Sequence, residues 1–365
     1  FLAGYGEELL QHGMTDDDLH TACTRWMAQL HAWEANVETH LPLLALHTVT
    51  GLDDVALLIW MTVGLIEEDP RFGLLFEALQ VTPGQHRPTI GLLSAWWRTT
   101  ETWNAVRAAL RQLQKLGLIE IVNPDAPRTE WALQTPSLLW DVIRGETQAS
   151  FATWLHYHTP DELTALDSLI LSPTLQQTLS TLPALFAAGE VQALVIRGPQ
   201  HNGRRTVVGA LALALGRGLL EIQDLLKPDD ARWRLVGTMA AMLHALPLIV
   251  CDPAPGETIE LPALTGYAGP LAVVLGKQGG LRGAQVEQAI ILTLEMPARA
   301  ERQQHWRQRS ALPADVLAEC STRFRTTSGN IRRVARLAQT YAVVAGRPTF
   351  TLMDAQQAHR ALNRQ

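Results

Sequence analysis

One stretch of the sequence has the residue types and spacing of a loop that binds phosphate. The apolar run 193–197 leads directly into Gly198, and Gly203 follows before a helix-forming stretch that begins near Val207. A strand, a glycine loop and a helix in this order place backbone N–H groups where they can bind the phosphates of a nucleotide. The predicted site comprises Gly198, Pro199, Gln200, His201, Asn202, Gly203, Arg204, Arg205 and Thr206.

Two side chains of this loop depart from the usual pattern GxxxxGK[ST]. Arg204 stands where that pattern has lysine, and Arg205 stands where a hydroxyl would bind Mg²⁺; Thr206 comes one residue late. Arginine keeps the positive charge, but its planar fork is larger than an ammonium group. We therefore expect the loop to retain affinity for ATP or ADP, and we do not expect it to hold Mg²⁺.

A second acidic position lies further along the chain. Asp252 ends the apolar run 248–251, as does the carboxylate that holds magnesium through water in nucleotide-hydrolysing enzymes. The next residue is Pro253 instead of a glutamate, so it cannot act as a general base, a loss that costs about 10²–10⁴ in rate. The run 271–275 then ends in Gly276 and Lys277, which offer no Asn or Thr to position water. We expect little or no hydrolysis.

Five apolar runs alternate with helical stretches in this half of the chain, at residues 193–197, 219–223, 248–251, 271–275 and 289–294. This alternation predicts an α/β fold with a parallel sheet covered by helices on both faces. Ligands of such sheets bind beyond the carboxyl ends of the strands, so the loop and Asp252 should meet there.

The first part of the chain predicts a mainly helical, winged-helix domain. Helices are expected at 16–34, from Gly51 onwards, at 70–79, 90–97 and 101–116, and two short strands at 118–122 and 130–133. Arg107, Arg111 and Lys115 form a basic stripe on one helix face, which is a pattern of DNA-binding helices. Residues 43–145 nevertheless carry a net charge of −3, which opposes binding to phosphate backbones. A solvated or protein-facing stripe, and a protein partner, fit this balance better.

Composition excludes several classes of protein. The chain has 365 residues, of which 47% are hydrophobic, a net charge of −6 and three scattered cysteines. No apolar run reaches the roughly 18 residues of a transmembrane helix. His156 and His158 have no third ligand nearby, so no metal site is expected there. The cysteines form no zinc or disulfide pattern, and a protein of the reducing cytoplasm is therefore expected. Residues from Arg282 onwards carry a net charge of +7, which suggests contact with an acidic surface of the same chain or of another subunit as readily as contact with nucleic acid.

At this point the sequence resembles the AAA+ ATPase family. Residues 294–306 are similar to the crossing from the last strand to the helical lid, and Ser328-Gly329-Asn330-Ile331-Arg332-Arg333 is similar to the lid segment whose arginine contacts the γ-phosphate. The resemblance implies that role for Arg332 and assembly into rings, commonly hexamers. By the same resemblance, Arg282 is either an arginine finger that acts on the site of a neighbouring subunit or an ordinary surface residue.

A narrower resemblance is to bacterial tandem AAA+ proteins with an N-terminal winged helix and a degenerate first ATPase domain that ends in a GRRT-type loop. Some of these are associated with contractile injection systems. The chain, which opens at Phe1, would then be the N-terminal half of such a protein, with an intact second AAA+ domain as its partner.

The expected organisation follows from these parts: a helical segment (1–40), a winged-helix domain (41–150), a helical linker (151–190), a degenerate AAA+ α/β domain (191–296) and a helical lid (297–365). We expect a regulatory or assembly module that binds nucleotide and hydrolyses little of it. The alternatives are an active ATPase that uses Arg204, Thr206 and either Glu257 or Glu260, and a nucleotide-free protein scaffold in which Arg204 and Arg205 form internal salt bridges.

Overall fold

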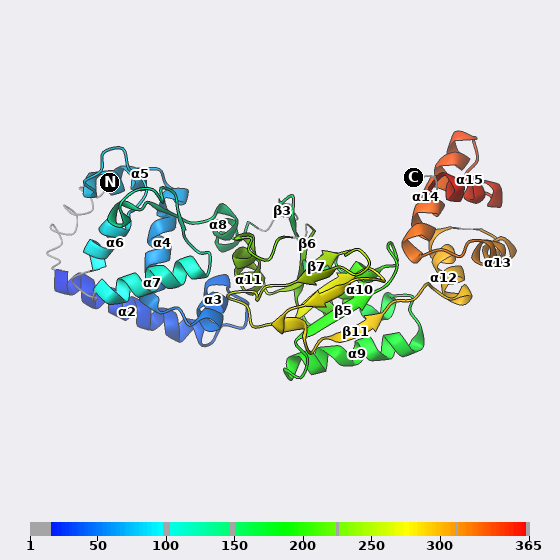
Figure 1. The fold of residues 1–365 in the computed structure, drawn as a ribbon, viewed down its shortest axis with the longest axis horizontal. Coiled ribbons are helices and arrows are strands. Elements are labelled where there is room, and N and C mark those ends of the chain that lie inside the picture. Colours follow the sequence, from blue (N-terminus) through cyan, green and yellow to red (C-terminus); the bar gives the residue numbers. More distant parts are fainter. Residues whose placement is uncertain (1–15, 98–102, 147–149, 224–225, 311, 363–365) are drawn as a thin grey trace.

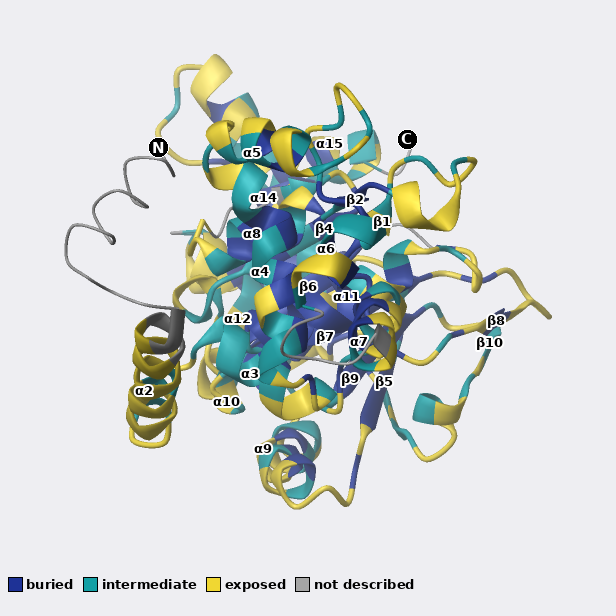
Figure 2. Cartoon of the chain, turned by 90° about the vertical axis from the view of Figure 1, so that its left-hand side faces the viewer, coloured by how far each residue is buried: buried dark blue, intermediate teal, exposed yellow. Residues whose placement is uncertain are grey.

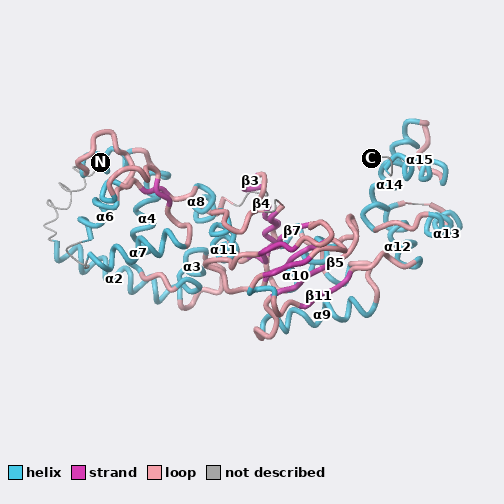
Figure 3. Tube along the Cα trace, in the orientation of Figure 1, coloured by secondary structure: helices cyan, strands magenta, loops and turns pink. Residues whose placement is uncertain are grey.

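The computed structural model describes residues 16–97, 103–146, 150–223, 226–310 and 312–362. The molecule is elongated, and three parts follow one another along its long axis (Figure 1). Helices dominate both ends, and most strands gather in the central part (Figure 3). The candidate site therefore lies in the middle of the molecule, between two helical ends.

The central part is built on a seven-stranded sheet with the order β11–β5–β9–β7–β6–β4–β3. The first five strands in this order are parallel, and β4 and β3 are antiparallel additions at one edge. The parallel strands are β5 (Ala193–Arg197), β6 (Gly218–Ile222), β7 (Ala245–Cys251), β9 (Leu271–Leu275) and β11 (Ile290–Thr293). All five apolar runs predicted as strands are thus confirmed.

These runs form strands because both of their faces are buried. Alternate residues of each strand enter two different cores, as the twofold period of a strand requires. In β5, for example, Val195 packs on one face with α11 (Arg232–Met242), whereas Leu194 and Ile196 pack on the other. The second face is covered by α9 (Pro173–Ala187) and α10 (Arg204–Ala214).

Residues 151–190 differ from the predicted helical linker. They begin with most of the hairpin β3 (Ser150–Ala152) and β4 (Leu155–His158), which extends the sheet beside β6, and they end in α9. Leu155 and Tyr157 are buried while His156 and His158 are half-buried, so this short segment has the alternation of a strand with one buried and one partly exposed face. The segment is part of the α/β architecture.

The N-terminal part contains seven described helices and one short hairpin. Gly117 follows the last helix before the hairpin and has φ of 73°, as predicted for a helix stop. The elements are α2 (Asp16–Glu34), α3 (Pro42–Thr50), α4 (Asp54–Glu68), α5 (Arg71–Leu79), α6 (Ile90–Trp96), α7 (Trp103–Lys115), β1 (Glu120–Ile121), β2 (Leu133–Gln134) and α8 (Ser137–Ile143). Residues 101 and 102, predicted as the start of α7, lie outside the described residues. Helices followed by a hairpin agree with the predicted element order, and the winged-helix assignment stays a prediction.

The apolar face of α2 does not pack as its sequence predicts. Trp26 and Trp33 remain 57% and 55% exposed, and Leu30 is only half-buried. Figure 2 shows the helix as an almost entirely exposed rod beside the rest of the molecule. Helical spacing therefore located the helix correctly, but among the described residues no element covers its apolar side.

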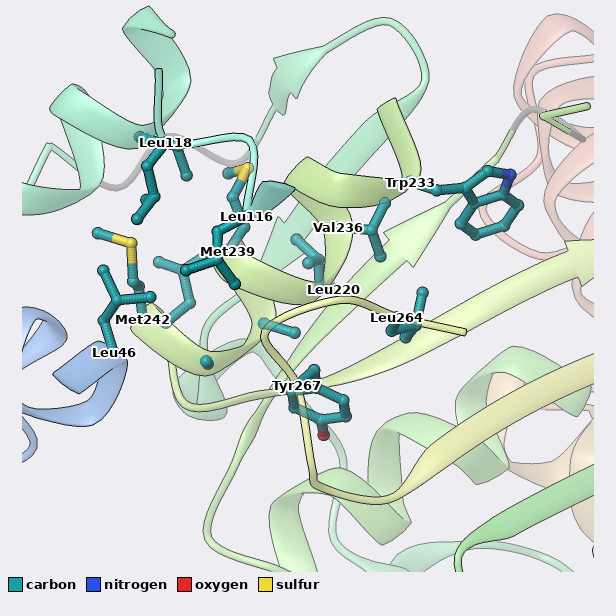
Figure 4. Packing of buried hydrophobic residues seen from close by; sticks show 14 of the residues in the cluster. Leu46, Leu116, Leu118, Leu220, Trp233, Val236, Met239, Met242, Leu264 and Tyr267 are labelled. Atoms are coloured by element: carbon teal, nitrogen blue, oxygen red, sulfur yellow. The ribbon is translucent and has the colours of Figure 1, made fainter. Parts of the chain in front are cut away.

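The N-terminal part and the sheet share one hydrophobic core. Leu46, Leu116 and Leu118 lie next to Met239 and Met242 of α11, whose opposite side packs on the sheet (Figure 4). The fully buried hydroxyl of Thr238 in α11 donates to the carbonyl oxygen of Leu116 at 2.9 Å. These two parts of the molecule are consequently joined through α11.

The C-terminal lid has a core of its own, formed around Trp306 and Phe324. Asp354 holds the connection between the last two lid helices in place. It accepts hydrogen bonds from both Nη atoms of Arg347, at 2.7 and 2.8 Å, and from the amide and hydroxyl of Thr351. The lid helices are α12 (Arg299–Arg309), α13 (Ala314–Arg323), α14 (Ser328–Val344) and α15 (Leu352–Leu362).

Candidate functional site

The predicted phosphate loop connects β5 to α10 at the carboxyl end of the parallel sheet. Gly198 has φ of 155°, and a Cβ atom there would lie 2.5 Å from the carbonyl oxygen of Leu294. Gly203 begins α10 with φ of 78°, and His201 also has a left-handed backbone. Both glycines are needed: the first because β11 passes too close for a side chain, the second because of its backbone angle.

The first turn of α10 presents free backbone donors at the loop. Its first amides, those of Arg204, Arg205 and Thr206, have no acceptor within the helix, and none among the described residues accepts from them. Such amides, together with the helix dipole, favour a bound anion. The loop therefore keeps the main-chain chemistry that phosphate binding requires.

Asn202 and His201 fix the loop between the last strand and the lid. The buried amide of Asn202 donates to the carbonyl oxygens of Leu294 and Glu295, at 3.0 and 2.7 Å. The amide of Gly329, at the start of α14, donates to the carbonyl oxygen of His201 at 2.8 Å. Any movement of the lid is thus coupled to the loop.

Arg204 turns towards the ends of the neighbouring strands. Its side chain is only 7% exposed, and its Nη1 atom lies 3.3 Å from Oδ1 of Asp252 and also donates to the carbonyl oxygen of Leu275. Gln200 donates to the other carboxylate oxygen of Asp252 at 3.2 Å. The two predicted parts of the site do meet, as an ion pair whose carboxylate has both oxygens engaged.

Arg205 makes a second ion pair, with Glu221 of β6. Glu221 is buried, and its other carboxylate oxygen lies 3.4 Å from Nε2 of His158 on the neighbouring strand β4. Glu221 is not among the site residues predicted from the sequence. The available signal was an isolated acidic residue within an apolar strand, because a buried carboxylate needs a cationic partner.

The remaining residues needed for hydrolysis are not gathered at the loop. Pro253 packs against Gly279, where an added Cβ would lie 2.3 Å from the proline ring. Glu257 accepts a hydrogen bond from the amide of Ala254 at 2.7 Å, and Glu260 lies on β8 (Thr258–Glu260), which pairs with β10 (Gly280–Arg282) outside the main sheet. Both carboxylates are exposed. Neither alternative base forms a hydrogen bond or ion pair with a described side chain of the loop.

The donor set does not fit Mg²⁺. Arg205 replaces the hydroxyl ligand, Thr206 is exposed one position later, and Arg204 places its positive charge on the carboxylate of Asp252. Magnesium needs oxygen ligands in near-octahedral geometry, and a guanidinium group at that carboxylate repels it. The described residues also contain no cluster of three or more His, Cys, Asp or Glu that could hold a metal.

Cys251 precedes Asp252 but offers no nucleophile. Burial, followed by the adjacent carboxylate of Asp252, raises the pKa of its thiol to about 12. The thiol therefore stays protonated at neutral pH, and thiolate chemistry at this position is excluded.

A cavity of about 260 Å³ lies beside the loop. Its walls come from three directions: the segment before α9, the crossing from β11 to the lid, and the start of α14. It is lined by Ile170, Leu171, Ser172, Leu175, Asn202, Thr293, Leu294, Glu295, Met296, Pro297, Ala298, Glu301, His305 and Ser328. Asn202 thus belongs both to the loop and to the cavity wall, so a molecule bound in the cavity would extend from the phosphate loop to the lid.

The other residues predicted from the sequence lie on the surface or are half-buried within the loop. Arg332 is exposed on α14, one turn beyond the helix start that contacts His201, and forms no ion pair with a described residue. Pro199 is half-buried within the loop. Arg282 is exposed on β10, and Arg107, Arg111 and Lys115 are exposed on α7. No described helix is both long and apolar enough to cross a membrane.

The strand order, the glycine loop and the helical lid together make up the α/β P-loop fold of the AAA+ type. No protein-family model matches the sequence, and no curated protein does. Solved AAA+ structures are similar to it in part. A RuvB point mutant from Thermotoga maritima has 18% identity and a TM-score of 0.38, covering 55% of this chain and 73% of that chain. The AAA domain of FIGL-1 has 10% identity and a TM-score of 0.42, covering 62% of this chain and 88% of that chain. A katanin structure, determined to explain katanin self-assembly, has 15% identity and a TM-score of 0.41, covering 62% of this chain and 91% of that chain.

Proposed function

We propose that this chain is a nucleotide-binding module of the AAA+ type that holds ADP or ATP without Mg²⁺ and hydrolyses little or none of it. The main support for this proposal is the loop: free amides at the start of α10 lie beside a cavity that reaches the lid. Arg204 supplies, at the carboxylate of Asp252, the positive charge that a metal would otherwise provide. Because Pro253 stands in place of a glutamate base and Arg205 in place of a metal-binding hydroxyl, binding is left as the function of the site.

The same geometry lets a bound nucleotide control the position of the lid. The loop carbonyl of His201 accepts from α14, and the cavity is walled partly by the lid. A nucleotide in this place would therefore stabilise one lid position. Such a module senses nucleotide or supports assembly, whereas a motor must release its product in every cycle.

Binding of ADP, measured by titration calorimetry with and without Mg²⁺, tests this proposal. We expect ADP to bind equally well in both conditions, and Gly203→Val to weaken binding at least tenfold because a β-branched residue strains the left-handed backbone on which the loop depends. Gly216→Val is the matched control: Gly216 also has a left-handed backbone, at φ of 66°, but lies away from the loop. No binding of ADP or ATP at millimolar concentration would reject the proposal.

A nucleotide-free scaffold is the second candidate, and the two internal ion pairs favour it. Arg204 and Arg205 are both satisfied by carboxylates of the same chain. In that case the native chain binds no nucleotide, and neutralising Arg204 leaves the cavity without affinity for diphosphate. An active ATPase predicts phosphate release above background, which the exposed positions of Glu257 and Glu260 do not favour.

The wider setting rests on the sequence resemblance. We propose that the chain acts in the cytoplasm as the N-terminal half of a tandem AAA+ protein associated with contractile injection systems, and that copies of it associate into a ring. Protein partners, rather than DNA, would then bind its N-terminal part.

A further inference from the structure

The two ends of the molecule carry opposite charge. Residues 1–40 contain seven acidic residues and one arginine, whereas residues 297–365 contain twelve arginines and four acidic residues. The described parts of these segments, α2 and the lid, lie at opposite ends of the long axis (Figure 1). Such a molecule attracts the opposite end of a second copy more strongly than the same end.

Each end also has an exposed stripe along one helix. On α2 the stripe consists of Cys23, Trp26, Leu30 and Trp33, and on α14 it consists of Arg333, Arg336, Thr340 and Val343. All of these side chains are exposed except that of Leu30, which is half-buried. Both stripes have the spacing that keeps residues on one helix face, and each spans about 15 Å.

The chemistry of the two stripes is complementary. The acidic sequence Asp16-Asp17-Asp18 precedes the tryptophans on α2, and Arg333 and Arg336 precede the apolar end of α14, where Val343 and Val344 are 63% and 82% exposed. Met353, 73% exposed on α15, adds apolar surface to the lid. A parallel alignment places acidic against basic residues at one end and aromatic against aliphatic residues at the other.

We propose that α2 of one copy of this chain docks on α14 of the next copy, so that copies associate head to tail. A contact between two different surfaces repeats from copy to copy, and it yields a ring if the rotation closes and a filament if it does not. Burial of Trp26 and Trp33 supplies the apolar part of the interface, and the arginines supply orientation. This inference rests on the self-association part of the proposed function and is independent of nucleotide binding.

Sedimentation velocity on the whole chain at micromolar concentrations tests the contact. We expect concentration-dependent association that weakens between low salt and about 0.5 M NaCl, because salt screens exposed charges. Trp26→Ala with Trp33→Ala, and separately Arg333→Glu with Arg336→Glu, should each weaken association at least tenfold. Val81→Ala and Arg309→Glu are matched controls, because both residues are exposed outside the two stripes, and they should associate like the native chain.

Mixing the two defective variants decides the geometry. Each variant keeps one intact surface, so an equimolar mixture should form a heterodimer and nothing larger. A mixture that stays monomeric, or single variants that associate as the native chain does, would overturn the α2–α14 contact. A native chain that remains monomeric would overturn self-association as well, whereas ADP titration of the same variants reports separately on the nucleotide site.

Discussion

The two arginines of the loop show what single residues decide in this protein. Arg204 and Arg205 keep positive charge beside a phosphate loop, yet each is directed to a carboxylate of the sheet. A lysine and a hydroxyl would leave Asp252 free to take part in metal binding, whereas a buried guanidinium group engages it. The substitution at one position thus changes the chemistry available at another.

Replacing Arg204 with methionine should cost about 1–3 kcal/mol of stability, because the buried carbonyl oxygen of Leu275 loses its donor and Asp252 loses its partner. ADP affinity should fall about tenfold in parallel, which corresponds to about 1.4 kcal/mol. Chemical denaturation and calorimetry measure the two effects. Arg307→Met, on the exposed face of α12, serves as control. Unchanged ADP affinity in Arg204→Met would show that the guanidinium group does not assist phosphate binding.

The sequence predicts where the two arginines lie, but it does not predict the carboxylate that pairs with Arg205. The spacing of Gly198 and Gly203 predicted the loop, and the position of Asp252 after an apolar run predicted that the two would meet. The partner of Arg205 depends on which residue of β6 faces α10, which is set by the register of the sheet. That register is a tertiary property, so Glu221 could not be assigned a role beforehand.

At the scale of elements, buried strands were easier to predict than edges and surfaces. The run 271–275 is apolar throughout because both faces of β9 are buried, and its length of five residues favours a strand over a helix. The antiparallel strand β4, next to the edge of the sheet, has only four residues, and α2 has an apolar stripe that no described element covers. Periodicity reports which residues prefer burial, but it does not report whether a neighbouring element is there to bury them.

The turn between α14 and α15 gives a prediction at this scale. The hydrogen bond from Arg347 is the largest cause that lowers the pKa of Asp354, and those from Thr351 add to it. Because this pKa is lower in the folded than in the unfolded state, the stabilisation is fully present above the ordinary carboxyl pKa and is lost as pH falls from there through the much lower pKa of the folded state. Asp354→Asn should therefore cost about 2 kcal/mol of lid stability near neutral pH and less than half of that near about pH 2.

Hydrogen exchange of the lid amides at the two pH values measures this difference. Asp315→Asn is a suitable control, since Asp315 is exposed at the start of α13. An equal effect of Asp354→Asn at both pH values would mean that the ionised carboxylate does not hold this turn.

At the scale of the whole molecule, the continuous core makes the N-terminal part and the sheet one unit. Met239 is fully buried between them, beside Leu116 and Leu46 (Figure 4). Met239→Ala should lower the free energy of unfolding by about 2–5 kcal/mol and should shift the transitions of both parts together. Met353→Ala, at an exposed position of α15, should change neither.

Two probes separate these parts during denaturation. Tryptophan fluorescence reports mostly on the N-terminal part, because nine of the eleven tryptophans precede residue 155, whereas exchange of the buried amides of β7 and β9 reports on the sheet. Coincident transitions are expected for a single cooperative unit. An earlier, separate loss of the N-terminal signal would show that the two parts unfold independently.

The hydrogen bond from Thr238 to Leu116, together with the packing around it, has a consequence for how this protein could have diversified. Recombination that exchanged the first 146 residues for an unrelated module would leave the outer side of α11 without its counterpart. The helix and the segment that covers it must therefore be inherited together, and homologous chains with another leading module should carry polar residues along that side of α11.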